Sequence, residues 1–286
     1  MKIAFTGSSG FIASSFREMS TLDNVKFVSL KRDETDEQWR KKISGCDVVM
    51  NFAGAPVVQR WNARNMQVIK SSRVHTTQRI VAILNVLPAS ESPGLFVSAS
   101  AIGVYPQDTE SAYDETSTVL GDDFLAEVVK EWEQSAHELV NEAVRLVLPR
   151  IGVVLGCKGG MLKMVTPLFK AGLGGRLASG RQGVSFIHIE DVVQILQFFI
   201  RNETTSGVYN LTAPNPVSNA EFTKRLAHVL KRWAVIPVPA FAIRILFGNA
   251  AGVVTKGSLI YPRNLQKAGY VFRYERIESA LSNLYG

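Results

Sequence analysis

The sequence predicts an α/β protein: a parallel sheet with helices on both faces, joined to a smaller, mostly helical lobe. Two features of the 286 residues predict it. In the first half, short apolar segments of strand length alternate with helical segments, as in a sheet built with crossover helices. In the second half, a Gly-rich segment spans residues 156–183 and mostly helical sequence follows residue 216. We therefore expect a sheet domain over residues 1–155, completed by residues 184–215, and a lobe of residues 156–183 and 216–286.

The first three expected elements are a strand, a helix and a strand. Residues 2–6 form a short apolar strand. Residues 11–19 repeat apolar side chains at helical spacing, with Ile12 and Phe16 on one face. Residues 25–30 form the second strand. The order predicts one strand–helix–strand unit with parallel strands.

The rest of the sheet domain continues the alternation. Residues 34–43 form a polar helix, residues 47–52 a buried strand, and residues 62–87 a long helix that Pro88 closes. The helix over residues 122–141 begins with two aspartates, where negative charge meets the positive end of the helix dipole. Short apolar strands are expected at residues 95–98 and 144–148.

The second half mixes two further strands with helices. The expected strands are residues 186–189 and 208–211. The expected helices are residues 161–171, 191–200 and 219–231, followed by helical segments at 237–248, 265–268 and 276–284.

The composition excludes several classes of protein. No apolar run reaches the roughly 18–20 residues that cross a bilayer, so we expect no membrane partner and no secretory signal. Two cysteines, Cys46 and Cys157, and four scattered histidines fit neither a disulfide scaffold nor a metal site. The net charge of +7 suits anionic partners, but the basic residues form only doublets and triplets, so we expect no nucleic-acid partner. A cytoplasmic location is the resulting expectation.

The turn after the first strand predicts a dinucleotide site. It comprises Gly7, Ser9, Gly10, Phe11 and Ile12 and leads directly into the first helix. The first glycine allows a tight turn, and the second lets a pyrophosphate approach the backbone. Free amides at the helix start can then bind the anion. A strand–turn–helix unit of this kind favours a Rossmann-type doubly wound sheet over a turn that binds nothing.

Two cations follow the second strand. Lys31 and Arg32 stand about 20 residues after the turn, where NAD-selective sites favour a carboxylate. Cations there would instead pair with a 2′-phosphate, so the cofactor expected is NADP, and NAD less so. The alternative is an exposed basic doublet followed by Asp33.

Further motifs follow the turn in a recognisable order. Residues 6–12 are similar to the TGxxGFxG turn, residues 51–54 to NxAG, residues 96–105 to the serine-bearing strand before VYG, residues 149–156 to RPxxVYGP, and residues 186–191 to FVHVDD. Together they resemble the extended short-chain dehydrogenases/reductases. Residues 71–73, 121–127, 172–175, 179–182, 213–217 and 237–241 resemble one atypical branch, the "epimerase family protein" group.

The resemblance implies an NADP-binding Rossmann domain with a small C-terminal substrate lobe. Beside the turn and the basic doublet, the cofactor-binding positions that it implies are Phe52, Ala53, Gly54, Arg73, Arg150, Ile151 and Val154. Arg73 would reach the cofactor from its helix; taken without the resemblance, it is an ordinary surface arginine. From the Gly-rich second half, Lys163 and Arg181 are candidates for binding an anionic substrate group, or are surface residues.

The chain departs from this family in its expected catalytic helix. Standard members carry Tyr-x-x-x-Lys, in which the tyrosine is the acid/base and the lysine lowers its pKa. No tyrosine here is followed four residues later by lysine. Phe124 or Leu125 stands in the tyrosine place and Val128 or Val129 in the lysine place. The remaining catalytic candidates are Ser100, as the first choice of proton donor, and Tyr105; each is otherwise a packed or capping residue.

Two functions therefore stay open. The first is an NADP(H)-binding oxidoreductase or epimerase-like enzyme acting on a small polar or nucleotide-linked substrate. The alternative is a non-catalytic NADP(H)-binding sensor or regulatory protein. A homodimer is left open.

Overall fold

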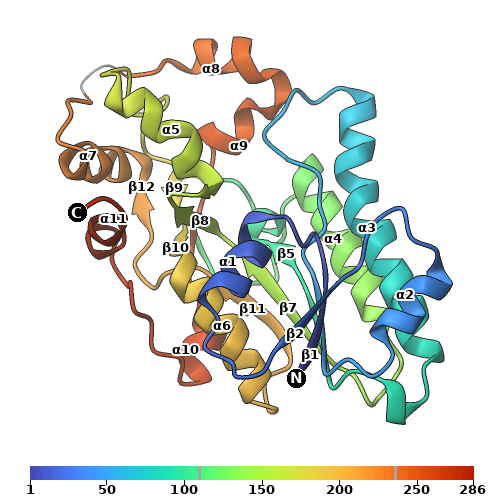
Figure 1. The fold of residues 1–286 in the computed structure, drawn as a ribbon. Coiled ribbons are helices and arrows are strands. Elements are labelled where there is room, and N and C mark those ends of the chain that lie inside the picture. Colours follow the sequence, from blue (N-terminus) through green and yellow to red (C-terminus); the bar gives the residue numbers. More distant parts are fainter. Residues whose placement is uncertain (109–110, 235–236) are drawn as a thin grey trace.

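The backbone of the computed structural model, which describes residues 1–108, 111–234 and 237–286, forms a seven-stranded parallel sheet (Figure 1). Across the sheet, the strands are β2 (Lys26–Ser29), β1 (Lys2–Thr6), β3 (Val48–Asn51), β4 (Leu95–Ser98), β7 (Arg145–Ile151) and β11 (Gly207–Leu211), and β5 (Ser100–Ala101) also pairs with β7. All these strand pairs are parallel. The predicted α/β fold with a doubly wound parallel sheet is confirmed.

The order of the strands creates a switch point between β1 and β3. The chain adds β2 on one side of β1 and then crosses back to place β3 on the other side. The described strands include none beyond β2, so the order is that of the flavodoxin-like doubly wound sheet, 2-1-3-4-5, with β11 added at the far edge; the 3-2-1-4-5-6 dinucleotide order has a second strand on the β2 side instead. In either order, ligands bind outside the carboxyl ends of the strands at the switch point.

Helices cover both faces because side chains alternate along each strand. In β1, Ile3 and Phe5 belong to one core cluster and Ala4 to another. The first cluster lies under α1 (Phe11–Met19) and α6 (Ile189–Arg201). The second lies under α2 (Asp36–Ile43) and α3 (Ala63–Val86), with α4 (Phe124–His137) packed beside α3 (Figure 1).

A separate hydrophobic cluster forms the core of the lobe. It contains Leu162 of α5 (Gly160–Lys170), Phe222 of α7 (Asn219–Val229) and Leu281 of α11 (Ile277–Tyr285). The lobe also contains α8 (Ala240–Phe247), the 3-10 helix η3 (Gly248–Ala251), α9 (Gly252–Thr255), α10 (Arg263–Lys267) and the short strands β9 (Gly183–Val184), β12 (Val217–Ser218) and β13 (Leu259–Ile260). β13 pairs with β6 (Ala112–Tyr113), which comes from the first half of the chain. The predicted domain boundaries stay a prediction.

The sequence-based expectation for residues 184–215 needs one correction. The strand expected at 144–148 runs on as β7 to Ile151, and after Gly152 the chain continues as β8 (Val153–Gly156). β8 pairs with β10 (Phe186–His188) in a two-stranded sheet. Of the two strands expected at 186–189 and 208–211, only the second, β11, therefore joins the main sheet. At Gly152 a Cβ atom would lie 2.5 Å from the Ser185 carbonyl oxygen, and glycine permits the chain to leave the main sheet there.

The C-terminal segment is tied back to α6 by a buried carboxylate. Asp191 accepts hydrogen bonds from the backbone amides of Arg273 and Tyr274 at 2.9 and 3.0 Å, and from the Tyr270 hydroxyl at 3.0 Å. These contacts hold the end of the chain against the sheet domain. Among the described residues, no helix combines the length and apolar character that a bilayer crossing requires.

A buried histidine at the start of α6 makes stability depend on pH. His188 is 0% exposed, its Nδ1 accepts a hydrogen bond from the Glu190 amide at 3.1 Å, and its ring lies 3.9 Å from that of Tyr274. Burial lowers the pKa of His188 to about 4. An unfolded histidine has a pKa of about 6.5, so the neutral ring contributes its full stability above about pH 6.5. That contribution is lost as the pH falls toward 4.

We expect His188→Gln to flatten the fall in stability between pH 7 and pH 4.5. Protonation of the unfolded chain alone should cost the wild type up to about 3 kcal/mol across this window. Urea unfolding at several pH values measures the slope. His228→Gln, at an exposed position on α7, is the matched control. A slope as steep in His188→Gln as in the control would contradict the prediction.

Candidate functional site

Two adjoining cavities lie along the carboxyl edge of the sheet at the switch point. The outer cavity, beside β1 and β2, has a volume of about 720 Å³, and the inner cavity, beside β5, β7 and α4, about 620 Å³. Both are lined by Gly10, Phe52, Ala53 and Gly54, so they form one groove. The groove therefore begins at the predicted turn and ends under the lobe.

The turn after β1 has the geometry of an anion-binding loop. Gly7 has φ of +62°, and a Cβ atom there would lie 2.6 Å from the Phe52 carbonyl oxygen, so glycine is required. The Gly10 amide donates to the Gly7 carbonyl at 2.8 Å, and α1 starts after Gly10 without a side-chain cap. Its first amides are left for an anion, and the residues present fit a dinucleotide pyrophosphate. Ser9, Phe11 and Ile12 also line the groove.

The outer cavity is basic. Lys31 and Arg32 line it, are exposed, and form no ion pair with another described residue. Arg79 of α3 also lines it; its guanidinium lies 3.9 Å from the Trp39 ring centroid and donates to Asp36 at 2.5 Å. Sequence reasoning missed Arg79, because it is distant in sequence from the turn and only the packing of α3 on α2 brings it there.

A buried hydrogen-bond chain supports the floor of the groove. Asn51 accepts a hydrogen bond from the Thr6 hydroxyl at 2.6 Å and donates to the Thr77 hydroxyl at 2.8 Å. Trp132 Nε1 donates to the same Thr77 oxygen at 2.9 Å. These contacts join β1, β3, α3 and α4 at the edge where the strands end.

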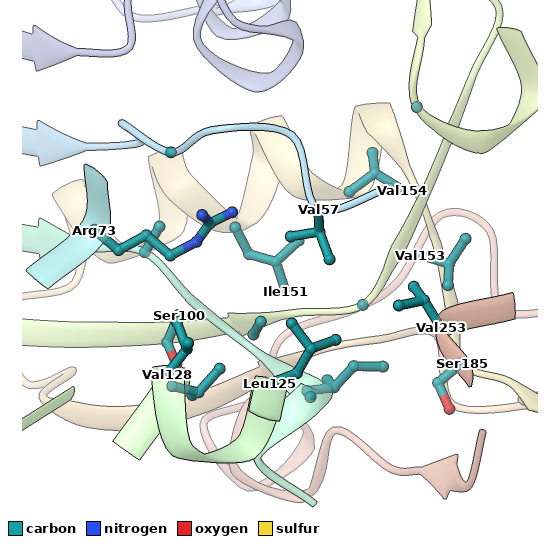
Figure 2. A pocket seen from close by; sticks show the side chains of 18 of the residues that line it. Val57, Arg73, Ser100, Leu125, Val128, Ile151, Val153, Val154, Ser185 and Val253 are labelled. Atoms are coloured by element: carbon teal, nitrogen blue, oxygen red, sulfur yellow. The ribbon is translucent and has the colours of Figure 1, made fainter. Parts of the chain in front are cut away.

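Arg73 reaches the inner cavity from α3. It donates to the carbonyls of Ile69 and Ala55 at 2.9 and 3.1 Å, and a Cβ atom at Gly54 would lie 3.0 Å from its Cζ. Burial lowers the pKa of Arg73 to about 10. No described residue forms an ion pair with it, so the guanidinium has charge left for a ligand. Figure 2 shows it in the same space as Val57 and Ile151.

Ser100 lies at the inner end of the groove and is held by a buried ion pair. Its hydroxyl donates to Glu133 Oε1. Arg150 holds the same carboxylate through Nε and Nη2, at 2.8 and 2.7 Å. Burial alone would lower the pKa of Arg150, but the hydrogen bonds and charge of Glu133 outweigh it and raise that pKa. Ser100 lines the inner cavity while its hydroxyl hydrogen is directed to Glu133, and the expectation that Ser100 donates a proton stays a prediction.

The structure corrects the placement expected of Tyr105 and Arg150, since neither lines the groove. The Tyr105 side chain is 0% exposed and lines neither cavity. Its hydroxyl accepts from Arg150 Nη1 and donates to Asn210, both at 2.9 Å, and burial raises its pKa. Arg150 is turned inward to Glu133 and lines neither cavity, whereas Ile151 and Val154 do line the inner one. Arg150 therefore positions Glu133, which is bonded to Ser100, and Tyr105 in turn is bonded to Arg150.

The wall where the resemblance places Tyr-x-x-x-Lys is apolar. Leu125 and Val129, four residues apart on α4, both line the inner cavity, as do Val128 and Trp132. Figure 2 shows Leu125 and Val128 on this wall. Phe124 does not; its ring packs 5.0 Å from that of Trp61. Of the alternatives expected from the sequence, the pair that faces the cavity at four-residue spacing is therefore Leu125 and Val129.

Residues that sequence reasoning missed close the inner cavity. Val253, Lys256 and Ser258 come from the lobe, and Gln107 and Ser185 come from segments outside it. No local motif marks them, because each reaches the cavity only through the tertiary fold. Lys163 and Arg181, expected at the substrate, are exposed and line neither cavity.

Comparison with protein-family models gives two matches. Residues 3–212 match the model described as NAD dependent epimerase/dehydratase family. Residues 238–284 match a domain of unknown function, DUF1731.

Similar proteins align over nearly the whole chain. The epimerase family protein SDR39U1 homolog, chloroplastic, of Arabidopsis thaliana is 36% identical, covering 98% of this chain and 86% of that protein. The epimerase family protein YfhF of Bacillus subtilis is 32% identical, covering 99% and 98%. The crystal structure of human epimerase family protein SDR39U1 (isoform2) with NADPH superposes with a TM-score of 0.93 at 28% identity, covering 100% of this chain and 99% of that one.

We expect that replacing only one residue of the Glu133–Arg150 pair lowers the unfolding free energy more than replacing both residues with apolar ones. Glu133→Ala leaves a buried, unpaired guanidinium and should cost about 3–5 kcal/mol of unfolding free energy. The double variant Glu133→Leu/Arg150→Met should lose less than the sum of its own single variants, Glu133→Leu and Arg150→Met. Urea unfolding measures the wild type and each variant.

Glu131→Ala is the control for this cycle. Glu131 lies on the same helix but pairs with Lys70 at the surface, where an ion pair contributes at most about 1 kcal/mol. If Glu133→Ala lowered the unfolding free energy no more than Glu131→Ala does, the buried pair would not contribute the stability predicted for it.

Proposed function

We propose, on the premise that this chain belongs to the NAD dependent epimerase/dehydratase family, that it binds NADPH in the groove and is an NADP(H)-dependent oxidoreductase or epimerase-like enzyme. The observation that carries the proposal is the continuous groove, which joins an uncapped glycine turn, a basic outer end and a hydroxyl at the inner end. The human relative crystallised with NADPH supports the choice of cofactor.

The chain's own residues divide the binding of the cofactor among them. The amides at the start of α1 would hold the pyrophosphate, and Lys31 and Arg32 the 2′-phosphate. Phe52, Ala53 and Gly54 would line the ribose, and Arg73 supplies a positive charge toward the inner cavity. When bound, such a cofactor supplies or accepts a hydride.

At the inner end, Ser100 would act as a hydrogen acceptor. Its oxygen accepts the hydrogen of a substrate hydroxyl, and its own hydrogen can pass to Glu133 Oε1, with which it is already bonded. Arg150 keeps Glu133 in place for this role. Water is excluded by the apolar wall of Leu125, Val128 and Val129.

The same wall favours a second candidate function. Leu125 and Val129 cannot transfer a proton or lower the pKa of a neighbour, so the groove would also serve a protein that binds NADP(H) without turnover. In that case, the cofactor would stabilise the lobe against the sheet domain, and a partner would recognise that state.

We expect Arg32→Asp to weaken NADPH binding at least about tenfold, because losing a charge-assisted hydrogen bond costs about 1.5–3 kcal/mol. Binding of NADH, which lacks the 2′-phosphate, should change no more than about twofold. Fluorescence titration of each cofactor gives both constants. Arg201→Asp, an exposed charge change on α6, is the control and should leave the ratio unchanged. An unchanged ratio in Arg32→Asp would remove the 2′-phosphate assignment.

We expect Ser100→Ala to abolish turnover while leaving NADPH affinity within about twofold. Losing a positioned proton acceptor should lower kcat by roughly 10²–10⁴. The assay follows nicotinamide absorbance with paired hydroxy and oxo compounds. Turnover by Ser100→Ala equal to that of the wild type would exclude the acceptor role. A wild-type protein that binds NADPH but turns over none of the pairs would favour the non-catalytic candidate.

A further inference from the structure

We propose that the molecule bound beside the cofactor is a small carboxylate with an apolar body, whose carboxylate is bound by Lys256. The inference rests on the proposed function, since it assumes that the cofactor occupies the groove. It departs from the expected polar or nucleotide-linked substrate.

The lining of the inner cavity carries the first part of this inference. No aspartate or glutamate is among its described lining residues. Its cations are Arg73, on the side of the sheet domain, and Lys256, on the side of the lobe. The rest of the lining is largely apolar and includes Val57, Leu125, Val129, Val253 and Ile260. A ligand that fits has an apolar body and a negative charge at the lobe end.

The backbone beside Lys256 is held in place, so the lysine side chain starts from a fixed point at the edge of the cavity. The Gly183 amide donates to the Gly257 carbonyl at 2.8 Å. These two segments of the backbone come so close that a Cβ atom at Gly257 would lie 2.4 Å from the Gly183 oxygen. Each position therefore needs glycine, and the backbone of Lys256 cannot move away from β9 without losing this contact.

Two serines extend this attachment on the far side of Lys256. The Ser185 hydroxyl donates to the Ser258 carbonyl at 2.9 Å and accepts from the Ile260 amide at 2.8 Å. Ser258 in turn accepts a hydrogen bond from the Asp108 amide at 3.1 Å. The segment 256–260 is thereby fastened both to β9 and to the loop after Tyr105.

The Lys256 side chain itself is available to a ligand. It is exposed, and no ion pair joins it to another described residue. An ammonium group on a flexible stem is a point charge that suits one carboxylate. At the edge of an apolar cavity, that charge would select the acid over a neutral molecule of the same shape.

A nucleoside diphosphate fits the lobe side less well. Its two phosphates bind most favourably to arginine forks or to the free amides of a helix start. The amides of that kind lie at the turn after β1, where the cofactor pyrophosphate is expected. On the lobe side, Lys256 is the single cation among the described lining residues.

Calorimetric titration of the NADPH-loaded protein tests this assignment without requiring turnover. The probes are 4-methylpentanoate, its neutral isostere 4-methylpentanamide, and UDP-glucose. We expect the acid to bind at least about tenfold more tightly than the amide, a difference of about 1.4 kcal/mol. Lys256→Gln should remove this preference. Lys267→Gln, an exposed lysine on α10, should keep it.

The outcomes separate this inference from the proposed function. NADPH binding is measured first, and its absence would overturn the proposed function and this inference with it. With NADPH bound, equal affinity for the acid and the amide, no measurable binding of the acid, or an unchanged preference in Lys256→Gln would overturn only the carboxylate assignment. Tighter binding of UDP-glucose than of the acid would overturn it in favour of a nucleotide-linked substrate.

Discussion

The buried ion pair between Glu133 and Arg150 is the interaction on which the inner end of the groove depends. Two charges removed from water are tolerated only when they satisfy each other, and here the carboxylate receives two hydrogen bonds from the guanidinium. The third donor of Arg150 goes to Tyr105, and Glu133 also holds Ser100. One pair thus fixes α4, β7, β5 and the loop that follows β5.

A second constraint, the close approach of β1 and β3, positions the outer end. The backbone after β3 passes so near Gly7 that no side chain fits there. The polar chain from Thr6 through Asn51 to Thr77 then locks the strand ends to α3 and α4. Since α3 carries both Arg79 and Arg73, the same packing sets the charge of the outer cavity and of the inner one. The packing of α3 therefore places a positive charge in each of the two cavities.

The lobe encloses the inner cavity and also supplies polar and charged side chains to its lining. Its glycines allow the segment around Lys256 to lie against β9, and its valine and serine complete a cavity that the sheet domain leaves open. The groove is consequently asymmetric: the outer cavity has backbone amides and several basic residues, and the inner cavity has mostly apolar side chains with Arg73 on the side of the sheet domain and Lys256 on the side of the lobe. That asymmetry matches a large anionic cofactor beside a smaller, less polar molecule.

The sequence by itself determined the alternating sheet, the glycine turn and the basic doublet, because each depends on neighbours within a few residues. It also showed that no tyrosine is followed by lysine at the required spacing. Tertiary structure alone decided that Leu125 rather than Phe124 faces the cavity, since that depends on how α4 rotates against the sheet. It likewise turned Tyr105 and Arg150 inward and brought Arg79 and Lys256 to the groove. Those placements arise from contacts between segments far apart in the chain, which local patterns do not encode.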